Sequence, residues 1–310
     1  MSMKQFPNVG PRAPWYGRGG AGPRPYHTTA HAARADTGEV RVLTLNLWGR
    51  DGAWADRRAV LIEGLQALQP DLVAFQEVIK TGEYDQMLDL LGSGWNIAYQ
   101  QGRHPSDGVG IALASRWPLS DVQEVNLHIT PRTTEDFPCG ALIAEVAAPA
   151  PVGPLLFVNH FPNWQLDFEY ERELQAVTVA RVLEERVHQR NVHVVLVGDL
   201  DADPAAASIR FWSGRQAVSG MSVCYRDAWE SQHPGEPGHT FAQENPLVAQ
   251  ANWDWPFRRI DYIFVRCGEH GGPTLKITSC QRIFDQPING VWASDHFGLI
   301  ADLAVPHRAV

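Results

Sequence analysis

A long series of short apolar runs, rich in β-branched residues and only sometimes separated by helical patterns, limits the fold of this chain more than any other feature. The runs expected to form strands cover residues 40–48, 72–78, 97–101, 108–115, 122–129, 141–147, 155–161, 192–200, 260–265, 275–284 and 297–304. Apolar residues at helical spacing predict helices over residues 56–68, 84–91, 168–189 and 205–212. Strands that follow one another directly favour antiparallel pairing, whereas a helix between two strands favours a crossover. The mixture predicts an α/β fold in which two mixed β-sheets pack face to face, flanked by helices.

The composition and the apolar periodicity of the chain change at residue 40. Residues 1–39 are rich in Gly, Pro and Arg and show no helical or strand period, which predicts a flexible tail. Trp15, Tyr16 and Tyr26 leave open the alternative of an arm that folds over the domain. Residues 40–310 contain no internal repeat and no second boundary, so we expect them to form one catalytic domain.

The net charge of the chain is −9, and it is unevenly distributed. Residues 1–39 hold five basic and two acidic residues, so residues 40–310 carry −12. Proteins that hold long nucleic acids by bulk charge present a basic face. The charge therefore argues against that mode of binding, but it does not exclude a site that handles phosphate locally.

The cysteines and the apolar runs of the sequence indicate the cellular compartment in which we expect the protein. The cysteines at positions 139, 224, 267 and 280 lack metal-ligand spacing and are too few for a disulfide scaffold. No run approaches the roughly 18 apolar residues of a membrane span, and the N-terminus lacks the apolar segment of a secretory signal. We therefore expect a cytoplasmic protein with reduced cysteines and no membrane span, with a monomer as the default oligomeric state.

Polar residues stand at the ends of several expected strands, where a core would not need them. They are Asn46, Glu77, His160, Asp199, Asp201, Asp261, Asp295 and His296. Taken singly, each is compatible with a cap, a turn or a surface position. Ionised groups beside apolar runs are nevertheless costly unless they are paired or metal-bound, and loops at strand ends are where sites are built. Together these residues predict one catalytic site.

The motifs that carry these residues occur in the order L-N-L, Q-E, N-H, G-D-L-D, R-I-D-Y and S-D-H. This order resembles the endonuclease/exonuclease/phosphatase superfamily over residues 41–303. Residues 108–119 resemble the family's strand that ends in Ser-Arg-x-Pro-Leu, and Arg172 and Gln175 follow His160 on a helix as in the family. The resemblance implies a deoxyribonuclease I-like, four-layer sandwich. The superfamily includes nucleases, sphingomyelinases and inositol-phosphate phosphatases, so the substrate stays open.

The resemblance also implies a divalent metal site. Glu77 would be the principal ligand, with Asn46 and Asp295 beside it. Oxygen ligands of this kind suit Mg²⁺ or Mn²⁺, which would bridge a phosphate oxygen and offset charge on the leaving oxygen.

Four further residues have catalytic roles by the same resemblance. Asp199 would orient or deprotonate the attacking water. His296, held by Asp261, would act as a base or, as an imidazolium, stabilise the pentacovalent phosphorus. His160 would donate a hydrogen bond to a phosphate oxygen.

One residue departs from the family pattern, which has Asp-x-Asn where this chain has Asp199-Leu200-Asp201. An ionised Asp cannot donate a hydrogen bond to phosphate. Asp201 could bind a second divalent ion, perhaps with Asp199; it could carry a proton; or the substrate could be handled differently, with weak activity. We favour the second ion among these three.

Residues around the expected site are candidates for substrate contact. Asn163 and Trp164 follow His160 closely, and Trp255 and Arg259 precede Asp261. Exposed aromatic rings can stack on a base, a sugar or a lipid headgroup, but they could equally cover a core edge. Arg259 could meet phosphate or instead pair with a carboxylate.

These expectations define a function. We predict a divalent-metal-dependent phosphoester hydrolase, a phosphodiesterase that acts on a small or lipid-like phosphoester by in-line attack of water. An endonuclease or exonuclease acting on nucleic acid is the closest alternative. The alternative from a different functional class is a catalytically silent binding module of the same fold. Asp201 is the only sequence feature that favours it.

Overall fold

The computed structural model describes residues 38–250, 257–269 and 271–306. The predicted tail lies outside the described residues except for its last two positions, and Trp255 lies outside them as well. The first strand begins at Glu39, one residue before the expected boundary.

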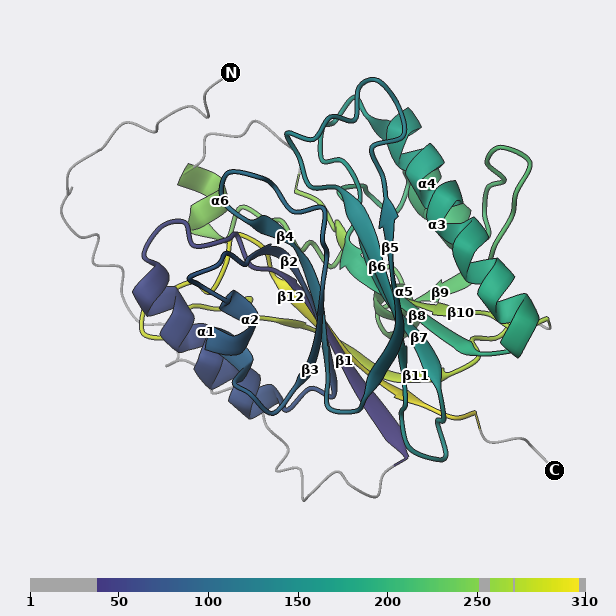
Figure 1. Cartoon of the computed structure of the whole chain (residues 1–310), viewed down its shortest axis with the longest axis horizontal. Helices are drawn as coiled ribbons and strands as arrows, with labels where there is room; N and C mark the ends of the chain where they lie inside the picture. The colour runs from purple at the N-terminus through teal and green to yellow at the C-terminus, as the bar shows by residue number, and fades with distance from the viewer. Residues whose placement is uncertain (1–37, 251–256, 270, 307–310) are drawn as a thin grey trace.

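Two six-stranded sheets form the centre of the fold (Figure 1). The first sheet has the order β11 (Lys276–Ile283), β12 (Gly298–Ala304), β1 (Glu39–Asn46), β2 (Leu72–Ile79), β4 (Val109–Ser115) and β3 (Asn96–Tyr99). The second has the order β5 (Leu119–Asn126), β6 (Gly140–Val146), β7 (Leu155–Phe161), β8 (His193–Asp199), β10 (Asp261–Arg266) and β9 (Tyr225–Asp227). Each sheet contains one parallel pair, β1–β2 or β7–β8, between antiparallel neighbours.

Helices connect the parallel pairs and occur between other strands. They are α1 (Trp54–Leu68), α2 (Gln86–Leu91), α3 (Glu169–Arg190), α4 (Ala207–Trp212), α5 (Ala228–Gln232) and α6 (Pro246–Gln250). Four of them, α1 to α4, cover the outer faces. The crossover from β1 to β2 contains α1, and the crossover from β7 to β8 contains α3. Among the described helices, none has both the length and the apolar content needed to cross a lipid bilayer.

Three apolar clusters separate four layers. One lies between the sheets and includes Leu113, Phe157 and Leu299. A second joins the second sheet to α3 and α4, and a third joins the first sheet to α1 and α2. Figure 1 shows α1 and α3 on opposite outer sides of the paired sheets. The predicted four-layer α/β sandwich is therefore confirmed.

Differences from the predicted elements have local causes. The strand expected over 122–129 is β5, which starts at Leu119 and ends at Asn126. It is an exposed edge strand whose pairing with β6 shifts between Ser120 and Gln123, so apolar alternation does not mark its limits. The short elements β9, α5 and α6 were missed because three to five residues carry too little period to detect.

Candidate active site

The predicted catalytic and metal-binding side chains lie at one end of the two sheets. Asn46 ends β1 and Glu77 lies near the end of β2, while β7 and β8 carry His160 and Asp199 at their ends. Because β10 and β12 run antiparallel to β8 and β1, the first residues of β10 and β12 lie at this same end. The structure thus brings together Asn46, Glu77, His160, Asp199, Asp201, Asp261, Asp295 and His296.

Asn46 joins the two sheets at the site. Its buried amide Nδ2 donates to Glu77 Oε1 at 3.1 Å and to Asp199 Oδ2 at 3.0 Å, while its Oδ1 accepts from the backbone N–H of Trp48 at 2.9 Å. Glu77 has a φ of 55°, and the pairing of β2 with β4 shifts between Phe75 and Val78, as a β-bulge does. The bulge re-aims Glu77 out of the regular alternation of β2.

His296 relieves repulsion between two carboxylates. Asp261 and Asp199 are direct cross-strand partners in β10 and β8, an arrangement that is unfavourable for like charges. The His296 Nδ1 is 3.0 Å from Asp261 Oδ2, and its Nε2 is 3.8 Å from Asp199 Oδ2. Burial lowers the pKa of His296, but the charges of Asp261 and Asp199 outweigh burial and raise it well above its usual value. The imidazole is therefore held as a cation between two carboxylates.

The other carboxylates crowd negative charge within the buried site. Burial, and then the charge of Asp295, raise the pKa of Glu77 to about 7. Burial also raises the pKa of Asp295, and burial together with the charge of Asp201 raises the pKa of Asp199 well above its usual value. Such a cluster favours a cation, and hard oxygen donors suit Mg²⁺ or Mn²⁺. The carboxylate oxygens of Glu77 and Asp295 therefore fit the predicted ion, whereas Asn46 directs its Nδ2 at Glu77 and its Oδ1 at the Trp48 N–H.

A second group also has ligand-like geometry. One ligand atom from each of Asp199, Asp261 and His296 lies within 4.8 Å of the others. His296 is already the hydrogen-bond partner of Asp261 in this group, and Mg²⁺ binds through oxygen rather than imidazole nitrogen. The carboxylate oxygens of Glu77 and Asp295 are therefore the better match to the predicted metal.

His160 lies where β7 and β8 come unusually close. The φ of Gly198 is 147°, and a Cβ there would lie 2.0 Å from the carbonyl oxygen of His160, so a larger residue would separate the strands. Burial lowers the pKa of His160 to about 3, which keeps its ring neutral. Its Nδ1 has no hydrogen-bond partner among the described residues. A neutral imidazole retains one N–H that can donate to a phosphate oxygen.

A polar network that the sequence analysis did not identify lies beneath the site. Gln76 Nε2 donates to Asn159 Oδ1 at 2.7 Å, which bonds the first sheet to the second. The Asn159 amide donates to the carbonyls of Phe75 and Ala112 at 2.9 and 3.0 Å. Gln76 and Asn159 are the first residues of the Q-E and N-H motifs. The sequence motifs that indicated Glu77 and His160 therefore also contained the residues of this network. Because Gln76 and Asn159 are bonded to each other, they fix the positions of the neighbouring residues Glu77 and His160 relative to one another.

Arg57 of α1 was also missed. Its buried guanidinium donates to the carbonyls of Leu47, Asp51 and Ala293, which belong to the segments that follow Asn46 and precede Asp295. Burial lowers its pKa to about 10, so it stays charged at neutral pH. One side chain thus ties together two segments that carry predicted metal ligands. A lone Arg in a helical pattern carries no sequence signal for this role.

Asp201 adopts a left-handed conformation with a φ of 51°. Its backbone N–H donates to Asp199 Oδ1 at 3.2 Å, and its carbonyl accepts from Arg258 Nη1 at 3.2 Å. Burial raises the pKa of the Asp201 carboxyl to about 6, against the lowering effect of the Arg258 and His296 charges. Arg258 therefore supplies a positive charge beside the residue that departs from the family pattern.

The predicted substrate contacts fall in different environments. Trp164 is 37% exposed, as a stacking residue requires. Asn163 is buried, and its side chain bonds to Gln165 and Gln175. Arg259 is buried in an ion pair with Asp227, where its Nη1 lies 2.6 Å from Oδ2. Of these three, only Trp164 presents a substantial surface to solvent.

Several solved structures share the fold at low sequence identity. Humanized D. rerio TDP2 carrying 14 mutations has a TM-score of 0.65 and 20% identity, over 87% of this chain and 100% of that one. D. rerio TDP2 complexed with a single strand DNA product has a TM-score of 0.64 and 20% identity, over 86% and 99%. The human Nocturnin catalytic domain with bound sulfate has a TM-score of 0.65 and 17% identity, over 87% and 95%. No curated protein matches the sequence.

A family match supports the same assignment from sequence. The model of the Endonuclease/Exonuclease/phosphatase family matches residues 43–296, which begin within β1 and end at His296. The matched range includes every catalytic and metal-binding position predicted from the motifs. Members of this family are phosphoester hydrolases and generally use divalent metals. The chain belongs to the Endonuclease/Exonuclease/phosphatase family.

Proposed function

We propose that this protein is a divalent-metal-dependent phosphodiesterase that cleaves a small phosphoester by in-line attack of water. The observation that carries the proposal is the position of His296 between Asp261 and Asp199, next to Glu77, whose carboxylate and that of Asp199 both accept from Asn46 Nδ2. A structural core would not require an imidazolium between two cross-strand carboxylates at the open end of both sheets.

Each residue has a chemical task in this proposal. Glu77, Asp295 and Asn46 would hold Mg²⁺ or Mn²⁺, and the ion would supply positive charge to a phosphate oxygen. Asp199 accepts a proton from water, whose oxygen attacks phosphorus while the opposite ester bond breaks and the leaving oxygen takes a proton from solvent. His296 as an imidazolium stabilises charge on the pentacovalent phosphorus.

Two observations bear on the kind of substrate. One D. rerio TDP2 structure holds a single strand DNA product and the Nocturnin structure holds sulfate, so related folds bind phosphate-like groups. The −12 carried by residues 40–310 still disfavours long duplex DNA. Nicking of plasmid DNA at low salt, faster than hydrolysis of small diesters, would favour the nuclease alternative.

Metal removal provides the direct test. We expect the chain to release p-nitrophenol from bis-p-nitrophenyl phosphate, to lose this activity in EDTA, and to recover it with Mg²⁺ or Mn²⁺ but not with Ca²⁺ alone. Mg²⁺ needs fewer protein ligands than Ca²⁺, which takes about six to eight oxygens, so a few carboxylate oxygens and a phosphate suit the smaller ion. Equal rates with and without EDTA would exclude the metal-dependent mechanism, and no release under any condition would favour the silent binding module.

The role of Asp201 is tested by Asp201→Asn. The sequence favours a second ion at Asp201, but the charge of Arg258 lies beside that residue, so we now expect calorimetry to find one Mn²⁺ per chain in both proteins. The new amide can donate to phosphate, so kcat/KM should rise about 2- to 10-fold, as one net hydrogen bond allows. Two ions in the wild type, falling to one in the variant, would instead establish Asp201 as a ligand of a second ion.

A further inference from the structure

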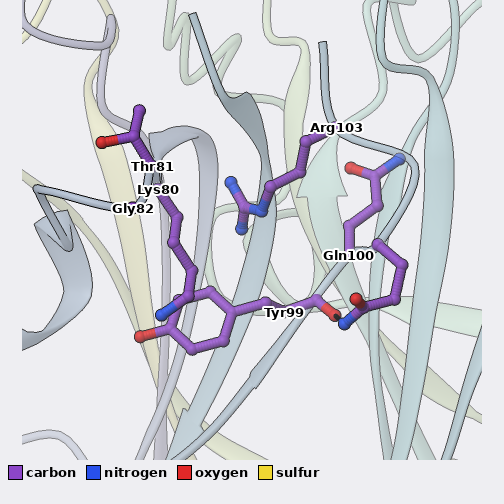
Figure 2. Close-up of a pocket in the computed structure, with 7 residues that line it drawn as sticks. Lys80, Thr81, Gly82, Tyr99, Gln100 and Arg103 are labelled. Atoms are coloured by element: carbon purple, nitrogen blue, oxygen red, sulfur yellow. Dashed lines mark hydrogen bonds between the residues drawn. The ribbon is translucent and has the colours of Figure 1, made fainter. Parts of the chain in front are cut away.

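A cavity of about 340 Å³ lies at the edge of the first sheet, where Lys80, Tyr99 and Arg103 are among the residues that line it (Figure 2). Lys80 forms an ion pair with Asp85. Arg103 donates to three backbone carbonyls and is close enough to Glu124 to feel its charge. The charged side chains of the cavity therefore already have partners within the chain. A reactive pair of side chains lies elsewhere, in the second sheet.

Cys224 and Cys267 lie opposite each other where β9 and β10 come to an end. The antiparallel pairing of these strands places Tyr225 opposite Arg266, and Cys224 and Cys267 are the next positions in the same register. The backbone N–H of Cys267 donates to the carbonyl of Cys224 at 2.8 Å, so the ladder extends to this pair. Directly opposed residues in such a ladder have Cα atoms ~4.5–5.5 Å apart, within the range that a disulfide bridges. Both thiols are free in the structure.

Neighbouring contacts hold the two cysteines in this register. The Tyr225 hydroxyl donates to Glu184 Oε1 at 3.2 Å, and Arg266 Nη2 lies 2.6 Å from Glu184 Oε2, so both residues of the preceding pair are tied to α3. On the other side, the Cys224 side chain packs against Gly214, where a Cβ would lie 3.1 Å from Cys224 Sγ. The approach of one thiol to the other therefore requires no change in strand pairing.

The two thiols differ in their access to solvent. Cys224 is exposed, whereas only 6% of Cys267 is exposed. Burial, and then a hydrogen bond with the Cys224 thiol, raise the pKa of Cys267 to about 11, against the lowering effect of the Arg226 charge. The side chains are thus in contact, with a guanidinium beside them. Reactive cysteines lie in such partly exposed, electropositive surroundings. Cys224 is therefore the sulfur that an oxidant in solution reaches first, and Cys267 is the sulfur next to it.

We propose that Cys224 and Cys267 are a modification site at which hydrogen peroxide forms a reversible disulfide. The Cys224 thiolate attacks one peroxide oxygen and the O–O bond breaks, which leaves a sulfenic acid, and the released hydroxide combines with the proton lost from the thiol. The Cys267 sulfur then attacks the sulfenic sulfur, an S–S bond forms, and the displaced hydroxide takes up the Cys267 proton. Two thiols thus lose two electrons in total, and one peroxide becomes two waters. An exposed disulfide of this kind is readily reduced.

The disulfide would enclose residues 224–267 in one covalent loop. This loop contains Asp227 and Arg259, which form a buried ion pair, and β9, an edge strand of only three residues. A cross-link restricts the unfolded chain, and its stabilising effect grows with the length of the loop. Because β10 begins at Asp261 and rises ~3.3 Å per residue, the bond would lie about 20 Å along the strand from Asp261. We therefore expect oxidation to stabilise this edge of the sheet and to leave the proposed active site unchanged.

Alkylation of the denatured full chain, before and after treatment with hydrogen peroxide, tests the bond directly. The untreated protein should carry the label on all four cysteines. After treatment only the buried Cys139 and Cys280, which are internal controls, should be labelled. Trypsin should then release residues 216–226 and 267–276 as one linked species, and dithiothreitol should restore all four labels.

Two variants show whether the bond has the expected cause and effect. The oxidised wild type should melt about 5 °C above the reduced protein, and Cys224→Ser, at an exposed position, should melt like the reduced wild type with or without peroxide. Arg226→Gln should slow bond formation about 2- to 5-fold, as the loss of one exposed charge interaction allows. Arg181→Gln, on the exposed face of α3, is the matched control and should leave the rate unchanged.

The alkylation result does not depend on the proposed hydrolysis, so the two proposals can fail separately. Four labels after peroxide treatment would overturn the disulfide. A link from Cys224 to a second chain, or a sulfinic acid at Cys224 with Cys267 still labelled, would overturn it as well. A linked pair that forms without a rise in melting temperature would support the modification site and contradict its stabilising effect.

Discussion

Replacement of Glu77 by Gln is expected to lower kcat/KM for bis-p-nitrophenyl phosphate by about 10³-fold, because a metal ion contributes several kcal/mol of charge stabilisation. The substitution keeps the size of the side chain and its place beside Asn46, but it removes the negative charge that attracts the ion. Calorimetry should show that the affinity for Mn²⁺ falls in parallel. The result would identify Glu77 as the principal metal ligand.

A control for charge removal is Glu63→Gln, on the exposed face of α1. It should leave both the Mn²⁺ affinity and kcat/KM unchanged. Thermal melting of Glu77→Gln should show a folded protein, since the amide preserves the hydrogen-bonded pair with Asn46. If Glu77→Gln binds Mn²⁺ as tightly as the wild type and turns over at the same rate, the assignment of the ion to Glu77 is wrong.

Replacement of His296 by Asn should cost about 10³-fold in kcat, within the range of positioned proton-transfer and electrostatic groups. Asn can still donate to Asp261, but it cannot carry the positive charge that lies between Asp261 and Asp199. Unlike Glu77→Gln, this variant should bind Mn²⁺ at least as tightly as the wild type, because a cation is removed from the site. The two variants thus separate metal binding from catalysis.

Two comparisons sharpen this second test. His188→Asn, at an exposed position of α3, should have wild-type kinetics. Because Asp261 acts through His296, Asp261→Asn combined with His296→Asn should be no slower than His296→Asn alone. Additive losses in the double variant would show that Asp261 has a separate role.

The main features of the fold and site could be predicted because they depend on local periodicity. Apolar runs indicated the strands, and the strand over 155–161 matches β7 at both ends. Polar residues at strand ends predicted a shared site because antiparallel and crossover connections return those ends to one edge. The fold is confirmed, whereas the roles of Glu77, His160 and the other site residues stay predictions until variants are measured.

Other features depend on contacts between distant segments, which a single sequence does not reveal. The bond between Gln76 and Asn159 joins residues 83 positions apart, and Arg57 reaches Ala293 over 236 positions. Arg259 could equally have faced phosphate or a carboxylate, and only the placement of Asp227 at the end of β9 decides where it lies. The order of the strands in the sheets, and not the type of residue, determines which of these distant residues come into contact.

The position of β1 between β2 and β12 has a consequence for how the protein is made. A ribosome that adds ~5–20 residues per second needs roughly 10–50 s to synthesise the stretch between Asn46 and the start of β12. In the finished fold β1, the purple strand in Figure 1, is paired with β12, the yellow strand beside it. Until β12 has been synthesised, this edge of β1 is unpaired. Asp295 and His296 have not been synthesised during that interval either. The last strand added closes the first sheet and brings Asp295 and His296 to the predicted site, so the proposed activity would require the complete fold.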